Sequence, residues 1–393
     1  MRSSAASDVY KRQPTSFGAA VKNAVQSLGR FLQDTVTQLV QQNLQESLAV
    51  TAMLTGAENT APAANSAGNA VSLAATDGDY TYQVLADGTA EITDYTGSAT
   101  ELVIPSEIDG YPVTSIGNHA FENCSFLIGV TIPEGVKNID ELAFNHCTSL
   151  EKIDIPATVT SIEGFAFANC TKLTQIDFPD SLTYIGEYAF HKCSNIQEII
   201  LPPNIKTIRH CAFAGTQITV ISIPNSASTL YSLGGTTDKS AFWGAERLTK
   251  IIFENGRTEI PVSALRGCPQ VTSVVIPETI TSIGDYAFSG CSGLTSIEFP
   301  SNVMIIGSYA FENCRSLISI KLPDSVTSIR GAAFEGCTSL TNITVDSDNE
   351  KYTDLDGILY NKEQTEIIRY PARKKAISYK TVSYTHLTLP TIA

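Results

Sequence analysis

Apolar and polar positions repeat with a constant period through most of the chain. Each period carries an Ala-Phe pair, and one of the ten copies has Leu265 in place of Phe. The ten alanines are Ala120, Ala143, Ala166, Ala189, Ala212, Ala241, Ala264, Ala287, Ala310 and Ala333. Successive alanines stand twenty-three residues apart, and the single longer step runs from Ala212 to Ala241. A fixed period of this length indicates a repeat architecture, in which each copy forms one structural unit.

Within each copy the apolar residues keep fixed distances from the alanine. In the copy of Ala287 they are Leu294, Ile297 and Phe299, followed by Pro300. The alternation of apolar and polar residues predicts a short strand, which ends at the proline because proline has no N–H to donate. A single copy cannot bury its apolar face alone, whereas stacked copies bury a continuous column. The pattern therefore predicts a β-rich repeat solenoid, with strands of successive coils about 4.8 Å apart.

The repeat motif resembles that of a known family. The pattern IPxxVTSIGxxAFxxCxxLTxIxIP, as in Ile276–Pro300 and Phe299–Pro323, resembles the BspA-type leucine-rich repeat of bacterial surface proteins. The resemblance covers residues 101–345, about ten repeats, and implies a leucine-rich repeat solenoid. It further implies an extracellular or cell-surface protein that binds a protein or glycan partner, such as host matrix or another cell surface. The family motif brings no catalytic residue and implies no cofactor.

The segment before the repeats divides into three parts. Residues 14–56 place Val21, Val25 and other apolar residues three or four apart, which predicts an amphipathic helix that packs on or precedes the solenoid. Binding of this helix to a membrane surface is the less favoured alternative, because its polar face carries little Lys or Arg. Residues 57–78 are rich in Ala, Asn and Ser, which is typical of a flexible linker. Residues 79–100 contain an Asp-Gly turn between two strand-like runs and predict a β-hairpin cap.

The remaining irregular segments lie inside and after the repeats. An insertion near residues 225–240 accounts for the single long step. Residues 346–381 resemble a hairpin insert of the same family, or the start of further repeats. Residues 1–13 and 382–393 do not fit the pattern of their neighbours and resemble translated sequencing adapter. The natural reading frame is therefore expected to continue beyond both ends.

Charge and hydropathy exclude two classes of partner. The chain has 393 residues with 40 acidic and 26 basic side chains, a net charge of -14 and a pI near 4.8. A surface that follows nucleic-acid phosphates needs a basic stripe, so no nucleic-acid partner is expected. No run of eighteen apolar residues occurs, so no membrane span is expected either.

The nine cysteines follow the repeat rather than a metal-binding pattern. Eight of them stand four residues after an alanine, and only Cys211 is out of phase. Equivalent positions of stacked coils point the same way, so these eight thiols are predicted to be small core fillers. Disulfides between coils are the less favoured alternative, and the paired spacing typical of zinc sites is absent. The four histidines of the repeats occupy four different offsets and are predicted to be solvated turn residues: His119, His146, His191 and His210.

One pair of carboxylates raises the alternative of a carbohydrate-active enzyme. Asp154 and Asp177 occupy the same outward column on adjacent coils, about 5 Å apart by strand spacing. That separation suits a retaining glycosidase. An exposed sheet offers no apolar pocket to raise the pKa of one of them, so a non-enzymatic protein without catalytic or metal residues is favoured.

The outward columns contain one aliphatic cluster. Ile200, Ile252 and Val275 stand eleven residues after their alanines, and Val220 occupies a neighbouring outward position. A contiguous exposed apolar surface with an aromatic anchor is typical of a partner site. The predicted ligand-binding residues are Ile200, Val220, Tyr231, Trp243, Ile252 and Val275. Two alternatives stay open: the insertion or the N-terminal helix covers this patch, or the repeats are a spacer that carries a missing catalytic or anchoring domain.

Overall fold

The computed structural model describes residues 75–230 and 239–374, and these ranges contain strands and turns without any helix. The chain divides into two units, Met1–Gly68 and Asn69–Ala393, and the described residues all belong to the second. The predicted helix over 14–56 and both adapter-like ends lie outside the described residues. So do most of the predicted linker and residues 231–238 of the insertion.

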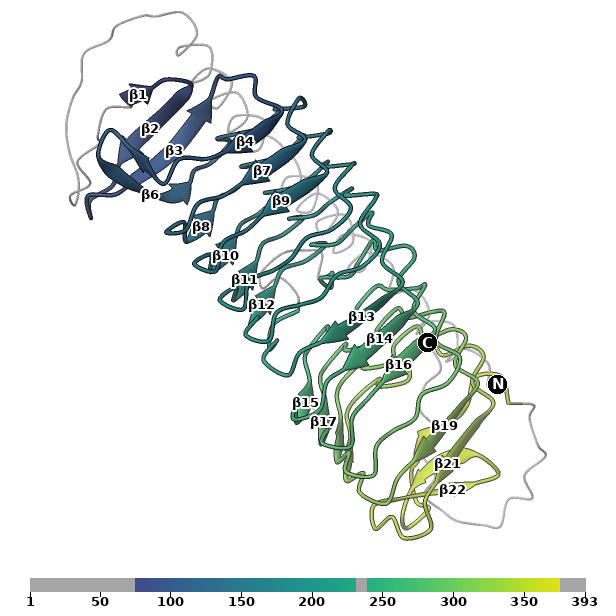
Figure 1. Ribbon diagram of the computed structural model, residues 1–393. Helices are drawn as coiled ribbons and strands as arrows, with labels where there is room; N and C mark the ends of the chain where they lie inside the picture. The colour runs from purple at the N-terminus through teal and green to yellow at the C-terminus, as the bar shows by residue number, and fades with distance from the viewer. Residues whose placement is uncertain (1–74, 231–238, 375–393) are drawn as a thin grey trace, which may run out of the picture. The chain divides into compact units, whose positions relative to one another are not determined.

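The described chain begins with an antiparallel meander of β1 (Ala75–Asp77), β2 (Tyr80–Val84) and β3 (Ala90–Tyr95) (Figure 1). Gly88, with φ of 79°, makes the turn between β2 and β3. The edge strand β3 then pairs in parallel with β6 (Tyr111–Ile116), which also pairs with β5 (Glu107–Ile108). The meander thus continues directly into the repeats.

The repeats form two parallel ladders, and Figure 1 shows them as two rows of arrows. The first ladder comes from the residues before each proline. Its strands are β4 (Glu101–Val103), β7 (Gly129–Thr131), β9 (Lys152–Asp154), β13 (Val220–Ile223), β14 (Lys250–Phe253), β16 (Ser273–Val275), β19 (Ser319–Leu322) and β21 (Asn342–Val345).

The second ladder comes from the residues after each proline. It continues from β6 through β8 (Asn138–Ile139), β10 (Ser161–Ile162), β11 (Tyr184–Ile185), β12 (Thr207–Ile208), β15 (Glu259–Ile260), β17 (Ser282–Ile283), β18 (Ile305–Ile306) and β20 (Ser328–Ile329). Ile162 pairs with Ile185, its equivalent in the next repeat, so one period makes one coil. The predicted β-rich solenoid is confirmed.

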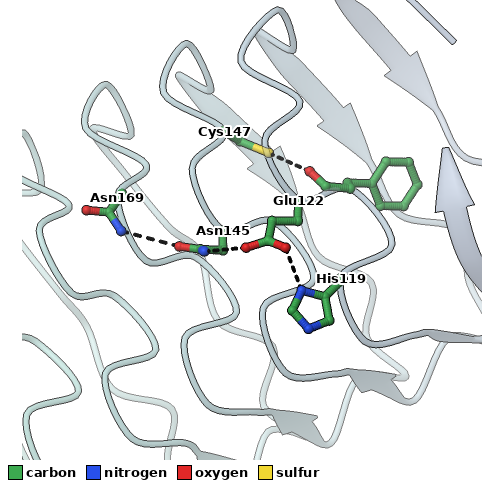
Figure 2. Close-up of polar contacts among 6 residues, drawn as sticks. His119, Glu122, Asn145, Cys147 and Asn169 are labelled. Atoms are coloured by element: carbon green, nitrogen blue, oxygen red, sulfur yellow. Dashed lines mark hydrogen bonds and ion pairs between the residues drawn. The ribbon is translucent and has the colours of Figure 1, made fainter. Parts of the chain in front are cut away.

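Between the ladders a column of phenylalanines fills the core. Phe121, Phe144 and Phe167 are fully buried, and successive ring centroids lie 5.0 and 5.3 Å apart with nearly parallel planes. The cysteine column runs beside it, and Cys147 Sγ donates to the carbonyl oxygen of Phe121 at 3.2 Å (Figure 2). All nine cysteines are buried and free, which confirms the prediction of a core ladder for the eight that follow the period.

In most coils, the turn that follows the buried phenylalanine contains a residue with a left-handed backbone conformation. Asn123, His146 and Asn169 have φ near 62°, and Gly290 takes the equivalent place in a later coil. A side-chain ladder joins these turns, as Figure 2 shows: Asn169 Nδ2 donates to Asn145 Oδ1 at 3.3 Å, and Asn145 Nδ2 to Glu122 Oε1 at 2.8 Å. These polar contacts repeat at the coil spacing and hold the turns in register.

The second ladder is interrupted at the insertion. Thr229 still pairs with Thr207, but in the described ranges no backbone hydrogen bond joins residues 228–230 to 258–260. Other coils close this junction with an N–H, as when Gly284 donates to Ile260 at 2.9 Å. Pro261 occupies the position equivalent to Gly284 and has no N–H to donate. The residue that prevents this hydrogen bond therefore belongs to the repeat that follows the insertion.

The described chain ends with a second antiparallel meander of β22 (Tyr352–Leu355), β23 (Ile358–Asn361) and β24 (Ile367–Arg369). It follows the last strand of the first ladder directly. Ile358 and Leu359 of β23 are buried, so the meander adds apolar side chains at this end of the repeats.

Candidate binding cleft

The first ladder opens between β9 and β13. The two intervening coils form no strand over residues 174–178 and 197–201, and Figure 1 shows turns without arrows there. Bonds still join the two coils to their outer neighbours: Thr174 N donates to Glu151 O at 3.4 Å, and Gln217 N donates to Ile196 O at 2.8 Å. Among the described residues no equivalent bond joins Gln197 N to Thr174 O, so the opening between these two coils also includes their start.

Two features of coil 174–178 disfavour strand pairing. Phe178 turns inward and meets Phe190 edge-on, with centroids 5.6 Å apart, and Phe299 packs in the same way in a coil that also lacks a strand. Asp177 follows Asp154 in the outward column, and like charges at neighbouring positions of a sheet destabilise the pairing. An inward-facing phenylalanine at this position does not by itself prevent strand pairing, because Phe253 stands at the same offset and lies within strand β14.

The opening is a cleft of about 560 Å³. We call it the Ile200 cleft; it is lined by Thr174, Gln175, Ile176, Asp177, Phe178, Asp180, Asn195, Gln197, Glu198, Ile200, Leu201, Pro202 and Pro203. Ile200 is 74% exposed, whereas its neighbours Ile199 and Leu201 point into the core and are 5% and 6% exposed. The outward placement predicted for Ile200 is what the structure shows.

The Ile200 cleft is acidic. Asp177, Asp180 and Glu198 line it, and its lining contains no lysine, arginine or histidine. Gln175 Nε2 donates to Asp177 Oδ1 at 2.8 Å, which leaves the other oxygen of this carboxylate without a side-chain donor among the described residues. The cleft combines an exposed aliphatic side chain with carboxylate and amide groups at its rim.

Three other predicted site residues lie on the adjacent strands of the first ladder. Val220 in β13 and Val275 in β16 are 44% and 42% exposed. Ile252 lies in β14, in register between Ser222 and Val275, and is half-buried because it belongs to the central strand of this three-stranded sheet. The structure thus places four of the six predicted residues on one ladder, in the coils of Ile200 to Val275.

The other two predicted residues lie apart from these four. Trp243 follows the buried Phe242 in a turn and does not line the Ile200 cleft. Lys239 Nζ lies 3.4 Å from the centroid of the Trp243 ring, which is a cation–π contact. The Trp243 indole also packs closely on Gly267. Tyr231 lies outside the described residues.

The two carboxylates of the glycosidase alternative are not enclosed together. Asp177 lines the Ile200 cleft, whereas Asp154 does not and instead accepts a hydrogen bond from Thr131 Oγ1 at 3.2 Å. Throughout the described ranges, no group of three or more His, Cys, Asp or Glu side chains is placed to hold a metal ion.

The histidine prediction is half right. His119 and His146 are exposed. His191 and His210 are half-buried because both pack edge-on against Tyr188, with ring centroids 5.4 and 5.1 Å away. Burial lowers the pKa of His191. The sequence offered no sign of this cluster, because the two histidines stand at different offsets and only the stacking of coils brings them together.

Arg257 is a buried cation that the repeat pattern did not predict. It stands sixteen residues after its alanine, in a column that is otherwise aliphatic from Val136 to Val326. Its Nη2 donates to three carbonyl oxygens of the preceding coil, and a cavity of about 380 Å³ adjoins it. Asn349, at the same offset in the last coil, donates from Nδ2 to the three equivalent carbonyls. A polar residue in an aliphatic column was the signal that would have revealed both.

The fold defines the class of protein: a parallel two-ladder solenoid of leucine-rich repeats. A family profile described as "BspA type Leucine rich repeat region (6 copies)" matches residues 114–233 and 258–388. These residues make up more than half of the chain, which therefore belongs to the BspA-type leucine-rich repeat family, a family typical of bacterial surface proteins.

Several solved structures are similar to this chain. A leucine rich cell surface protein from Faecalibacterium prausnitzii is 29% identical, over 71% of this chain and 90% of that one, with a TM-score of 0.38. A leucine-rich repeat protein from Bacteroides ovatus is 27% identical, over 68% of this chain and 93% of that one, with a TM-score of 0.30. No curated protein matches the chain. Among residues 75–230 and 239–374, no helical segment meets the length and hydropathy that a membrane span requires.

Proposed function

We propose that this chain is a non-enzymatic binding or adhesion protein, extracellular or attached to the cell surface, that uses its repeat scaffold to bind a protein or glycan partner. Host matrix and other cell surfaces are the proposed sources of that partner. The proposed contact surface is the outward face of the first ladder from Ile200 to Val275, and the binding or surface role of the family is consistent with it.

The observation that carries this proposal is the exposure of Ile200 within a cleft. Isolated apolar side chains on a surface are ordinary. Ile200 is instead 74% exposed in a cleft of about 560 Å³, and the next three coils present Val220, Ile252 and Val275 on the same ladder. An exposed aliphatic group inside a concave, polar-rimmed surface is typical of a site that a partner covers.

The chain offers a matched control for testing this surface. Val103 is also 74% exposed and lies in the same outward column, because it pairs with Thr131, which pairs with Asp154. The full chain, Ile200→Ser and Val103→Ser are applied to an array of matrix proteins and glycans. We expect Ile200→Ser to weaken a detected interaction at least tenfold, while Val103→Ser leaves it unchanged and both variants keep the wild-type Tm.

Two outcomes contradict the proposal. An array that stays silent with folded protein supports the spacer alternative, in which the repeats only separate other domains. Equal loss of binding in both variants places the contact elsewhere on the chain. Tyr231 and Trp243 remain proposed contacts, and the variants Tyr231→Ala and Trp243→Ala in the same array test them separately.

A further inference from the structure

We propose that the Ile200 cleft binds an extended basic peptide segment, which adds to the first ladder as a strand. This inference rests on the proposed function and names the chemistry of the partner. It follows from three properties of the cleft: unpaired backbone, negative charge and the absence of an exposed aromatic face.

The first property is the unpaired backbone. In the described part of the chain, residues 175–178 and 197–201 take part in no strand pairing. Strands β9 and β13 flank these two coils and do not line the cleft, so the backbone groups open to a peptide there are those of residues 175–178 and 197–201 themselves. Backbone N–H and C=O groups need hydrogen-bond partners, and an extended peptide supplies both kinds along its length.

The second property is charge. Three carboxylates, those of Asp177, Asp180 and Glu198, line the cleft without a basic side chain among them. The chain as a whole carries a net charge of -14, which adds a long-range attraction for cations. Lysine or arginine side chains of a partner would neutralise the rim, whereas an acidic or phosphorylated segment would be repelled.

The third property separates a peptide from a glycan. Phe178 is the sole aromatic side chain in the lining, and it is half-buried with its ring edge-on to Phe190. The cleft therefore presents no aromatic face on which a sugar ring could stack. Ile200 offers instead a contact for one aliphatic side chain. In an extended peptide, alternate residues project to the same face, so a segment with a basic residue and an aliphatic residue at successive same-face positions presents both kinds of group to the cleft.

The probes are three short synthetic peptides carrying a fluorophore, and their anisotropy is measured with the full chain. One peptide repeats Lys-Ser-Val-Ser and is called the Lys-Val peptide, and the second repeats Glu-Ser-Val-Ser, so that charged and aliphatic side chains alternate along one face. The third has the sequence of the Lys-Val peptide with alternate backbone nitrogens methylated, which keeps its side chains and charge but removes the donors that a strand needs. We expect the first to bind, the second to show no binding, and the methylated peptide to bind at least tenfold more weakly.

Variants of the chain test whether the peptide occupies this cleft. We expect the triple variant Asp177→Asn, Asp180→Asn, Glu198→Gln to weaken binding of the Lys-Val peptide at least tenfold. The matched control removes three exposed carboxylates elsewhere, namely Asp324→Asn, Glu350→Gln and Glu363→Gln, and should leave binding unchanged. Ile200→Ser should weaken binding without altering the salt dependence.

Each contrary result has a distinct meaning. Equal binding of the methylated peptide overturns strand addition, and equal binding to the two triple variants shows attraction to the overall charge rather than to the cleft. If the Lys-Val peptide does not bind, the inference fails. The proposed function still stands in that case when a partner from the array depends on Ile200, and both fail when no cleft variant alters any interaction.

Discussion

Arg257 enters the aliphatic core column one coil after Ala227, and its guanidinium donates a hydrogen bond to the carbonyl oxygen of Ala227. The two residues are complementary in size. Ala227 stands where neighbouring coils have larger residues such as Ile205 and Ile280, and its small side chain leaves room for the long side chain of Arg257. The same guanidinium bonds to the carbonyls of Pro224 and Asn225, so it holds the turn that precedes the insertion.

Replacing Arg257 by Ala should lower the free energy of unfolding by about 2 to 4 kcal/mol, because the change empties part of the core and leaves three carbonyls without their side-chain donor. Urea unfolding followed by circular dichroism measures this loss. Arg330→Ala is the control, since Arg330 is exposed and its ion pair with Asp285 at 3.5 Å lies on the surface, where such a pair contributes at most about 1 kcal/mol. Equal losses would show that Arg257 does not hold the core.

Asp140 should make stability depend on pH. Burial raises its pKa to about 6, helped by repulsion from Glu91 and Glu163 and opposed by a hydrogen bond from Ser115. The folded protein thus favours the protonated carboxyl, so the free energy of unfolding should fall as the pH rises from about 4 to about 6. Asp140→Asn removes this dependence and should be about 1 to 2 kcal/mol more stable than the wild type at pH 7, with no difference below the unfolded pKa.

Thermal unfolding of the wild type and Asp140→Asn at pH 3.5, 5 and 7 measures this effect. Asp324→Asn removes an exposed carboxylate and serves as the control, with the same Tm as the wild type at each pH. A difference between Asp140→Asn and the wild type that is as large at pH 3.5 as at pH 7 would contradict an origin in the ionisation of Asp140.

The nine thiols should not react with a disulfide reagent in the folded protein, and all nine should react once the protein is unfolded. Burial raises the pKa of Cys268 to about 12 and that of Cys124 to about 11, so almost no thiolate exists at pH 8. We expect no reaction with a disulfide reagent under native conditions and nine reactive thiols in denaturant. Cys124, at 6% exposure, should react first as denaturant is added. Fewer than nine thiols in denaturant would reveal disulfides.

Amide hydrogen exchange should report the opening of the first ladder. Residues 175–178 and 197–201 lack inter-coil backbone bonds in the described structure, so their amides should exchange at least tenfold faster than those of β14, which pairs on both edges. Mass spectrometry of peptic fragments resolves these segments. Equal protection of the three segments would mean that the ladder is closed in solution. Added Lys-Val peptide should slow exchange at residues 175–178 and 197–201 alone.

Much of this fold follows from the sequence. Because every coil repeats the same positions, the 23-residue period predicts the solenoid, the column of Phe121 and its equivalents, and the burial of the eight in-phase cysteines. Averaging over ten copies makes these predictions robust, since a local exception in one coil does not change the phase. The outward position of Ile200 follows from the same phase.

Individual coils depart from the repeat where only contacts between coils decide the outcome. Ile252 has the same phase as Ile200, yet it is half-buried because its strand is paired on both edges. His191 and His210 both pack against the ring of Tyr188, although the two histidines stand at different positions of their repeats.

The sequence by itself therefore determines the scaffold and which side chains face outward, because both depend on a periodic pattern of single residues. The tertiary structure decides where the ladder opens, which carboxylates meet around Ile200, and how Arg257 is accommodated beside Ala227. These features depend on the size and charge of side chains from neighbouring coils acting on one another, and a periodic pattern contains no information about such pairs.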